Sequence, residues 1–296
     1  MSVKSSSIVL IAIIFSLFLQ FNKVFAGMDL SVMPAGPAIR TGNTTIQNII
    51  LDLKTKNHWQ LLVTPLNSSF RNISHPASQI PVSQAELQDN DSSNTFTLEF
   101  GKPVVVDSGD NNDKIDKNLT LRISTPDGYY PGTYTGTIQF TLISSKGTSV
   151  ENFSVSFDQP TIQDISILPN EVNINILPEN CMQMNYSQES SSPTKIYIRS
   201  NKNWKLILNS QKTDNPLNYY FKTLSSSNSS NLYYSDYTQL SNTNLIVAEG
   251  SPTISSDNKN IEPATVQINY KLETDKYSAL PAGAYPYNVV YNLTSR

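Results

Sequence analysis

Apolar and polar residues alternate along most of the chain with a period of two. Leu51 and Leu53 are separated by a polar neighbour, and so are Leu119, Leu121 and Ile123. This period places every second side chain on one face, which is typical of a strand buried on one side. Beyond residue 26, no window sustains the 3.6-residue period of an amphipathic helix. The pattern therefore predicts an all-β chain.

The alternating stretches are separated by short segments rich in Asn, Asp, Gly, Pro and Ser. Examples are residues 107–113, 126–132 and 255–260. These residue types favour turns, because they accept positive φ or hydrogen-bond to their own backbone. Short strands with frequent turns are typical of antiparallel sandwiches of the immunoglobulin-like (Ig-like) type.

Three blocks of the first half return in the same order in the second half: 29–34 as 164–169, 51–63 as 196–208, and 130–142 as 280–293. Matches that keep their order along the chain indicate an internal duplication. We therefore predict two tandem Ig-like antiparallel β-sandwiches, repeat 1 over residues 27–159 and repeat 2 over residues 160–296.

Residues 1–26 have the pattern of a secretory signal peptide. Lys4 supplies a positive charge, residues 8–21 are mostly apolar, and Val24 and Ala26 precede the expected cleavage site. The apolar run is shorter than the ~20 residues that span a bilayer. We expect a secreted or cell-surface protein with no membrane span in its mature form.

The composition narrows the classes of function. The 296 residues carry 21 basic and 24 acidic side chains, a net charge of -3, and one Cys. This balance argues against nucleic-acid binding, which favours a basic face. A single Cys excludes an internal disulfide. Because familiar enzyme motifs such as Gly-x-Ser-x-Gly are absent from the sequence, we expect a non-enzymatic protein without a cofactor.

Four aromatic residues occupy matched positions in the two repeats. Trp59 and Trp204 each begin an alternating stretch, and we interpret both as core residues. Exposed platforms for stacking sugars are the alternative for the tryptophans. Tyr134 and Tyr285 follow Pro-Gly and Pro-Ala-Gly turns. We interpret these tyrosines as structural residues that bury the ring and bond the hydroxyl to nearby backbone.

A group of tyrosines falls in the long connection of repeat 2, residues 211–244: Tyr219, Tyr220, Tyr233, Tyr234 and Tyr237. Tyrosines exposed together make good contact surfaces, because they are stiff and amphipathic. Function also lies more often on connections than on strands. The group is our candidate binding surface, and burial of the loop over the sheet is the equal alternative.

The single acidic cluster comprises Asp107, Asp110, Asp113 and Asp116. Carboxylates in a flexible loop suit a hard cation such as calcium. The spacing does not match an EF-hand loop, because Lys114 stands where a ligand or Gly is required. A solvated turn is the favoured interpretation, and calcium binding in the first repeat is the alternative.

Paired motifs in each repeat resemble those of WxL-type bacterial surface domains: Trp204-Lys-Leu206 with Tyr291-Asn-Leu293, and Trp59-Gln-Leu61 with Phe140-Thr-Leu142. That resemblance implies noncovalent binding to peptidoglycan on Gram-positive cells. The Pro-Ala-Gly-x-Tyr ending is also similar to the last strand of spore coat U-like and fimbrial-subunit sandwiches.

Together these observations predict a bacterial cell-envelope protein with a structural or adhesive role. Its expected partners are a cell-wall polymer, a surface glycan or another surface protein. One alternative is a secreted carbohydrate-binding accessory module or a glycosidase, whose two carboxylates have no fixed sequence spacing. Another is a pilus-like subunit, which an unpaired strand edge would favour, because such an edge templates strand addition.

Overall fold

The computed structural model describes residues 28–111, 114–177, 186–210, 217–229, 231–240, 243–254, 263–274 and 283–296. Antiparallel strands make up this part of the chain, with one 3-10 turn at Val82–Gln84. The all-β prediction is confirmed. The predicted signal peptide lies outside the described residues, and none of the helices within them is long and apolar enough to cross a membrane.

The chain divides into two compact units. Unit 1 takes the chain up to Thr125 together with Thr133–Asp158. Unit 2 takes Pro126–Gly132 together with Gln159–Arg296. Each unit is a sandwich of two sheets, so each has a core between its sheets.

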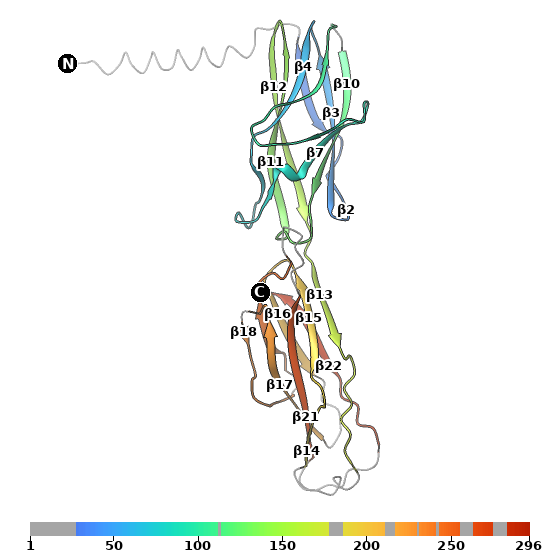
Figure 1. Cartoon of the computed structure of the whole chain (residues 1–296), viewed down its shortest axis with the longest axis vertical. Coiled ribbons are helices and arrows are strands. Elements are labelled where there is room, and N and C mark those ends of the chain that lie inside the picture. The colour runs from blue at the N-terminus through green and yellow to red at the C-terminus, as the bar shows by residue number, and fades with distance from the viewer. Residues whose placement is uncertain are drawn as a thin grey trace, which may run out of the picture. The chain divides into compact units, whose positions relative to one another are not determined.

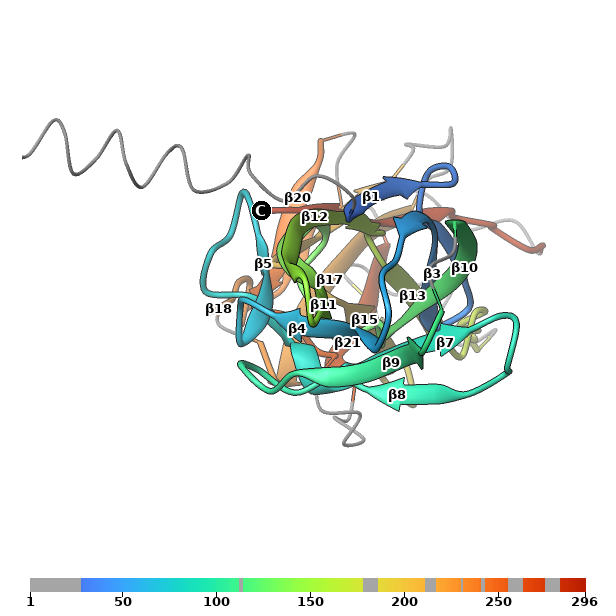
Figure 2. The same ribbon diagram turned by 90° about the horizontal axis from the view of Figure 1, so that it is seen from above.

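Unit 1 contains two sheets (Figure 1). The first runs in the order β1 (Asp29–Pro34), β3 (Thr44–Lys54), β10 (Lys114–Ser124), β7 (Ala85–Asp89) and β8 (Thr95–Thr97), with β2 (Ile39–Thr41) also on β3. The second runs in the order β6 (Gln79–Pro81), β5 (Ser69–Asn72), β11 (Gly132–Ser144), β4 (Trp59–Pro65) and β9 (Val104–Gly109). Strand β12 (Gly147–Gln159) pairs with the other side of β11. In Figure 2, β4 and β9 lie side by side, as their pairing requires.

The alternation in the sequence becomes the core of unit 1. Leu51 and Leu53 of β3 are fully buried, and so are Leu61 and Val63 of β4 in the other sheet. Burying a side chain of this size contributes about 1.5–3 kcal/mol relative to leaving it exposed. The period of two thus directs one face of each sheet towards the other.

Unit 2 also has two sheets. One runs in the order β13 (Gln163–Leu168), β15 (Thr194–Ser200), β21 (Ala264–Thr274), β17 (Leu217–Ser227) and β19 (Thr238–Gln239), with β14 (Ser187–Glu189) also on β21. The other runs in the order β18 (Asn231–Leu232), β20 (Leu245–Gly250), β16 (Trp204–Ser210) and β22 (Val289–Ser295).

Corresponding strands of the two units pair in the same register. Leu61 lies opposite Leu142 in unit 1, and Leu206 lies opposite Leu293 in unit 2. The strands β4 and β11 therefore correspond to β16 and β22, residue by residue. This correspondence allows the two units to be compared at single positions.

Each tryptophan packs on a glycine of the neighbouring strand. Trp59 and Trp204 are 4% and 0% exposed, and they lie opposite Gly109 and Gly250. A Cβ atom on Gly250 would lie 2.3 Å from Cζ2 of Trp204. Only glycine leaves room for the indole there. Because both tryptophans are buried, neither presents a face on which a sugar can stack.

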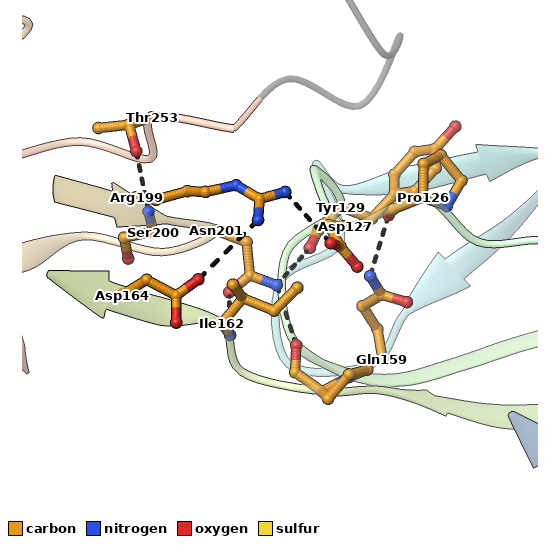
Figure 3. A network of polar contacts seen from close by, with 11 residues as sticks. Pro126, Asp127, Tyr129, Gln159, Ile162, Asp164, Arg199, Ser200, Asn201 and Thr253 are labelled. Atoms are coloured by element: carbon orange, nitrogen blue, oxygen red, sulfur yellow. Dashed lines mark hydrogen bonds and ion pairs between the residues drawn. The ribbon is translucent and has the colours of Figure 1, made fainter. Parts of the chain in front are cut away.

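Unit 2 includes the segment Pro126–Gly132, which the chain reaches between β10 and β11 (Figure 3). Asn201 is fully buried and holds this segment within the unit. Its Nδ2 donates to the carbonyl oxygens of Tyr129 (3.1 Å) and Pro160 (2.9 Å). Its Oδ1 accepts the backbone N–H of Ile162 at 2.9 Å. Unit 2 is therefore built from two separate stretches of chain, which the sequence analysis did not foresee.

Candidate functional site

Strand β11 of unit 1, and β22 of unit 2 with the residues just before it, present alternate side chains towards the core. In unit 2 these are Tyr285, Tyr287, Val289, Tyr291 and Leu293. The shared register matches them with Tyr134, Gly136, Ile138, Phe140 and Leu142 of unit 1. We call the five residues of unit 2 the open strip, because as a row they are more exposed than their counterparts in unit 1.

Strand β12 covers this row of side chains in unit 1. Tyr134 and Phe140 are fully buried. The ring of Phe157 stacks on Tyr134 with centroids 5.7 Å apart, and the ring of Phe153 meets Phe140 edge-on at 6.3 Å. Figure 1 shows β12 running beside β11. The burial of the row thus depends on a strand that follows it in the sequence.

The corresponding row in unit 2 is only half-buried. Strand β22 pairs with β16 on one side, and within the described residues it is the edge strand of its sheet. All five residues of the open strip retain exposed surface. An apolar row beside an unpaired strand edge is a template for one more strand.

A small cluster of apolar side chains lies next to the open strip. Leu217 and Leu272 are buried, and Ile174 and Ile176 pack against them together with Tyr285. The two isoleucines belong to residues 171–177, whose exposure alternates as in a strand. This segment therefore lies next to the Tyr285 end of the open strip.

The five tyrosines proposed as a binding surface do not form one cluster. Tyr234 packs edge-on against the core residue Phe221, with ring centroids 5.4 Å apart. The ring of Tyr219 stacks on Tyr287 at 4.1 Å. Tyr233 donates its hydroxyl hydrogen bond to Glu249 at 3.2 Å.

The remaining two, Tyr220 and Tyr237, lie on the outer face of the β17–β21 pair. The Lys271 ammonium sits 4.8 Å from the ring centroid of Tyr220 and 4.6 Å from that of Tyr237. Lys222 lies 4.3 Å from the Tyr237 centroid. Desolvation, together with a hydrogen bond to the Glu189 carboxylate, raises the pKa of Tyr237 well above its usual range. We call Tyr220, Tyr237, Lys222 and Lys271 the tyrosine–lysine patch.

Carboxylates neutralise both cations of this patch. Lys271 lies 2.6 Å from Glu273, and Lys222 lies 3.8 Å from Glu189. Lysines cap the faces of both aromatic rings, so the patch is already a paired network. Its pairing suits a polar contact surface better than a pocket for a charged ligand.

The two tyrosines interpreted as structural, Tyr134 and Tyr285, differ from each other in burial. Tyr134 is fully buried, and its hydroxyl forms a hydrogen bond with the side chain of Ser78 at 2.6 Å. Burial raises the pKa of Tyr134 above its usual value. Tyr285 is half-buried, and its carbonyl oxygen accepts the hydroxyl of Tyr219 at 3.1 Å. The difference in burial follows from the presence of β12 in unit 1.

The acidic cluster is divided among separate partner side chains. Asp107 lies 2.8 Å from Lys117, and Asp110 lies 2.7 Å from His58. Asp116 lies 4.0 Å from Lys114, and Asp113 is outside the described residues. In the part of the chain that the structure describes, no group of three metal-binding side chains occurs.

A buried ionic cluster in unit 1 escaped the sequence analysis. Lys117 is 5% exposed and lies 2.9 Å from Asp89 and 2.8 Å from Asp107. Desolvation opposes the charge of Lys117, but hydrogen bonds to both carboxylates prevail and raise its pKa. Desolvation also opposes the charge of Asp89, yet bonds from Ser92 and Lys117 lower its pKa. The available signal was a lysine in phase with Leu119 and the other inward residues of β10.

Unit 2 has uncharged residues at the same three positions. The shared register places Val266 where unit 1 has Lys117, because Ile196 lies opposite Val266 as Leu51 lies opposite Lys117. Thr223 and Ala248 take the places of the two aspartates. The ionic cluster is therefore a feature of unit 1 alone.

Comparison with known proteins finds no matching family model and no matching curated protein. Several solved structures resemble the chain. The CupB6 tip adhesin from Pseudomonas aeruginosa is 8% identical, with 90% of this chain and 93% of that chain covered and a TM-score of 0.40. The CooA pilin subunit from enterotoxigenic Escherichia coli is 14% identical, with 43% and 94% covered and a TM-score of 0.27.

A chain of the chaperone–tip adhesin complex of CFA/I fimbriae biogenesis is 14% identical, with 83% of this chain and 90% of that chain covered and a TM-score of 0.27. All three TM-scores are below 0.5. These likenesses therefore carry no argument about function, which has to come from the geometry of the two units.

Proposed function

We propose that the protein is an exported, non-enzymatic subunit of a bacterial surface assembly, and that unit 2 accepts an extended strand from another protein subunit. One observation carries this proposal. The same row of side chains is sealed by β12 in unit 1 and remains half-open along β22 in unit 2. Of the three expected partner classes, the proposal selects a surface protein.

An added strand would form hydrogen bonds with the backbone of β22 and cover the side chains of the open strip. Among the described strands of unit 2, β22 has one edge without a neighbour, and that edge offers N–H and C=O groups to an incoming strand. The incoming side chains would cover the half-buried residues of the open strip. Each Å² of apolar surface that they bury contributes about 25 cal/mol to the free energy of binding. Backbone bonds supply affinity, and the alternate side chains supply specificity.

Strand β12 shows which pattern the accepted strand needs. Its residues Phe153, Val155 and Phe157 point inward at every second position and are nearly fully buried. A partner for unit 2 therefore requires an extended segment with alternating inward side chains. Alternating patterns are common in strands. The partner is therefore distinguished by how well its inward side chains fit the open strip, and not by its composition alone.

The first test attaches a copy of strand β12 to the end of unit 2. We expect that the sequence of β12, residues 147–159, attached after Arg296 through a flexible linker, will raise the melting temperature of unit 2 by roughly 5 °C or more. The linker gives the strand a high effective concentration, so weak pairing becomes measurable. Calorimetry of the secreted form, residues 27–296, provides the reference.

The control carries the same linker and strand with Phe153, Val155 and Phe157 replaced by serine. It retains the backbone but lacks the inward apolar side chains, so it should leave the melting temperature unchanged. Equal melting temperatures for all three proteins would contradict strand addition. Saturable sedimentation of residues 27–296 with purified cell-wall sacculi would favour the wall-polymer partner instead.

A further inference from the structure

Two positions have apolar residues in unit 1 and tyrosines in unit 2. One belongs to the open strip, and the other lies on a strand of the opposite sheet. The shared register matches Tyr291 with Phe140, because Tyr291 lies opposite Leu208 as Phe140 lies opposite Val63. It likewise matches Tyr270 on β21 with Leu121 on β10. A leucine and a phenylalanine in the sealed unit thus correspond to two tyrosines in the open one.

The two tyrosine hydroxyls meet inside unit 2. Tyr270 and Tyr291 share a hydrogen bond through their hydroxyl oxygens. Burial raises the pKa of Tyr270 to about 12, and burial with the neighbouring Tyr270 raises the pKa of Tyr291 well above its usual value. Two neutral hydroxyls carry two protons, and their mutual bond uses one. Among the described residues, no other group bonds to either hydroxyl.

This pair lies where an added strand would contact unit 2. Phe140, the counterpart of Tyr291, is in contact with Phe153 of β12. Leu121 and Phe140 are 0% exposed, whereas Tyr270 and Tyr291 are only partly buried. The opening of the strip therefore reaches the tyrosine pair, and the residue that takes the place of Phe153 would lie against it.

We infer that the strand accepted by unit 2 carries a short hydrogen-bonding side chain, Ser, Thr or Asn, at the position that β12 fills with Phe153. This inference rests on the proposed strand addition. The two tyrosines occupy more volume than Leu121 and Phe140, so a phenylalanine in the strand would be crowded. They also present a hydroxyl proton that finds no acceptor in the described part of unit 2, and an apolar side chain would bury this proton unpaired.

The polar pair also gives unit 2 a means of discrimination. A site that buries hydrogen-bonding groups rejects a ligand that cannot pair with them. Strand β12 of this same chain has Phe153 at the critical position. Unit 2 would therefore bind strands of the β12 type less tightly than a partner strand with a polar residue at that point.

Binding of two synthetic peptides tests the inference. Both have the sequence of residues 147–159, and the second has threonine in place of Phe153. We expect the threonine peptide to bind residues 27–296 roughly tenfold more tightly in a fluorescence anisotropy titration, the difference that one additional hydrogen bond makes. In the Tyr270→Leu, Tyr291→Phe double variant, which reproduces unit 1, the preference should shift to the phenylalanine peptide.

The outcomes separate the inference from the function on which it rests. Equal binding of the two peptides, or tighter binding of the phenylalanine peptide to the unaltered protein, overturns the polar selection while supporting strand addition. Binding of neither peptide to either protein overturns strand addition, and the inference with it. Should the double variant fail to fold, the single Tyr291→Phe variant still leaves the Tyr270 hydroxyl proton to be paired. It should therefore keep the threonine preference, and equal binding of the two peptides to it would contradict the inference.

Discussion

The pairing of a tryptophan with a glycine is the clearest packing constraint at the scale of single residues. Both units have it, at Trp59 with Gly109 and at Trp204 with Gly250. The sequence shows that the tryptophans are matched. It does not show that a glycine must face each of them, because the glycine belongs to a different strand.

Gly250→Ala should therefore destabilise unit 2 by about 1–3 kcal/mol, the usual cost of overpacking a core. The added Cβ would meet the indole of Trp204 at 2.3 Å, so the ring or the strand has to move. Gly283→Ala is the matched control, because a Cβ there meets nothing within 4 Å. Urea denaturation followed by tryptophan fluorescence measures both, and equal stability of the two variants would refute the constraint.

At the scale of strands, the ionic cluster joins β7, β9 and β10 across the two sheets of unit 1. Lys117 on β10 reaches Asp89 on β7 and Asp107 on β9. Removing one member of a buried ionic group leaves an uncompensated charge, which costs about 3–5 kcal/mol. Replacing the whole group by apolar residues that pack well is often neutral or stabilising.

We expect Lys117→Ala to destabilise unit 1 by about 3 kcal/mol or more. The triple variant Lys117→Val, Asp89→Thr, Asp107→Ala copies unit 2 and should be at least about 2 kcal/mol more stable than Lys117→Ala. Calorimetry at pH 7 distinguishes the two. A triple variant less stable than the single one would show that unit 1 needs the charges themselves.

The same cluster makes the stability of unit 1 depend on pH, and its acidic and basic members act at opposite ends of the pH range. Asp89 has a pKa below its usual 3.8, so its contribution is present above that pH and is lost as the pH falls through the lower folded value. Lys117 has a pKa above its usual 10.5, so its contribution is present below that pH and is lost as the pH rises through the higher folded value. The triple variant should lack both losses.

The open strip shows the limit of sequence reasoning about strands. The stretches 134–142 and 285–293 both follow a short sequence with Pro and Gly, and they have a similar inward pattern. One is sealed and the other half-open, because burial depends on whether another strand pairs alongside. The sequence predicted the two strands but not their different surroundings.

At the scale of the whole molecule, the division into units does not follow a single cut in the chain. The duplication predicted two successive sandwiches. Unit 2 nevertheless includes Pro126–Gly132, which is held by the buried side chain of Asn201. Nothing in the composition of a turn-rich segment indicates which unit contains it.

Asn201→Ala should therefore destabilise unit 2 by about 2–4 kcal/mol, since it removes a buried side chain and its hydrogen bonds to the carbonyl of Tyr129 and the N–H of Ile162. Asn209→Ala is the control, because the Asn209 side chain bonds to Asn244 at the surface and its loss should cost no more than about 0.5 kcal/mol. Calorimetry should show two transitions, with only that of unit 2 lowered by Asn201→Ala. A cost for Asn201→Ala no larger than that of the control would contradict this role.

The sequence by itself determined the all-β fold, the duplicated blocks and the matched aromatic positions. These properties are local or repetitive, because a period of two, a turn signal and a repeated block can each be read within a short stretch. The tertiary structure decided which row of side chains is covered, which tyrosines come together, and how a buried lysine is neutralised. Each of these depends on contacts between residues far apart in the chain, as when Asp89 and Asp107 converge on Lys117 from different strands.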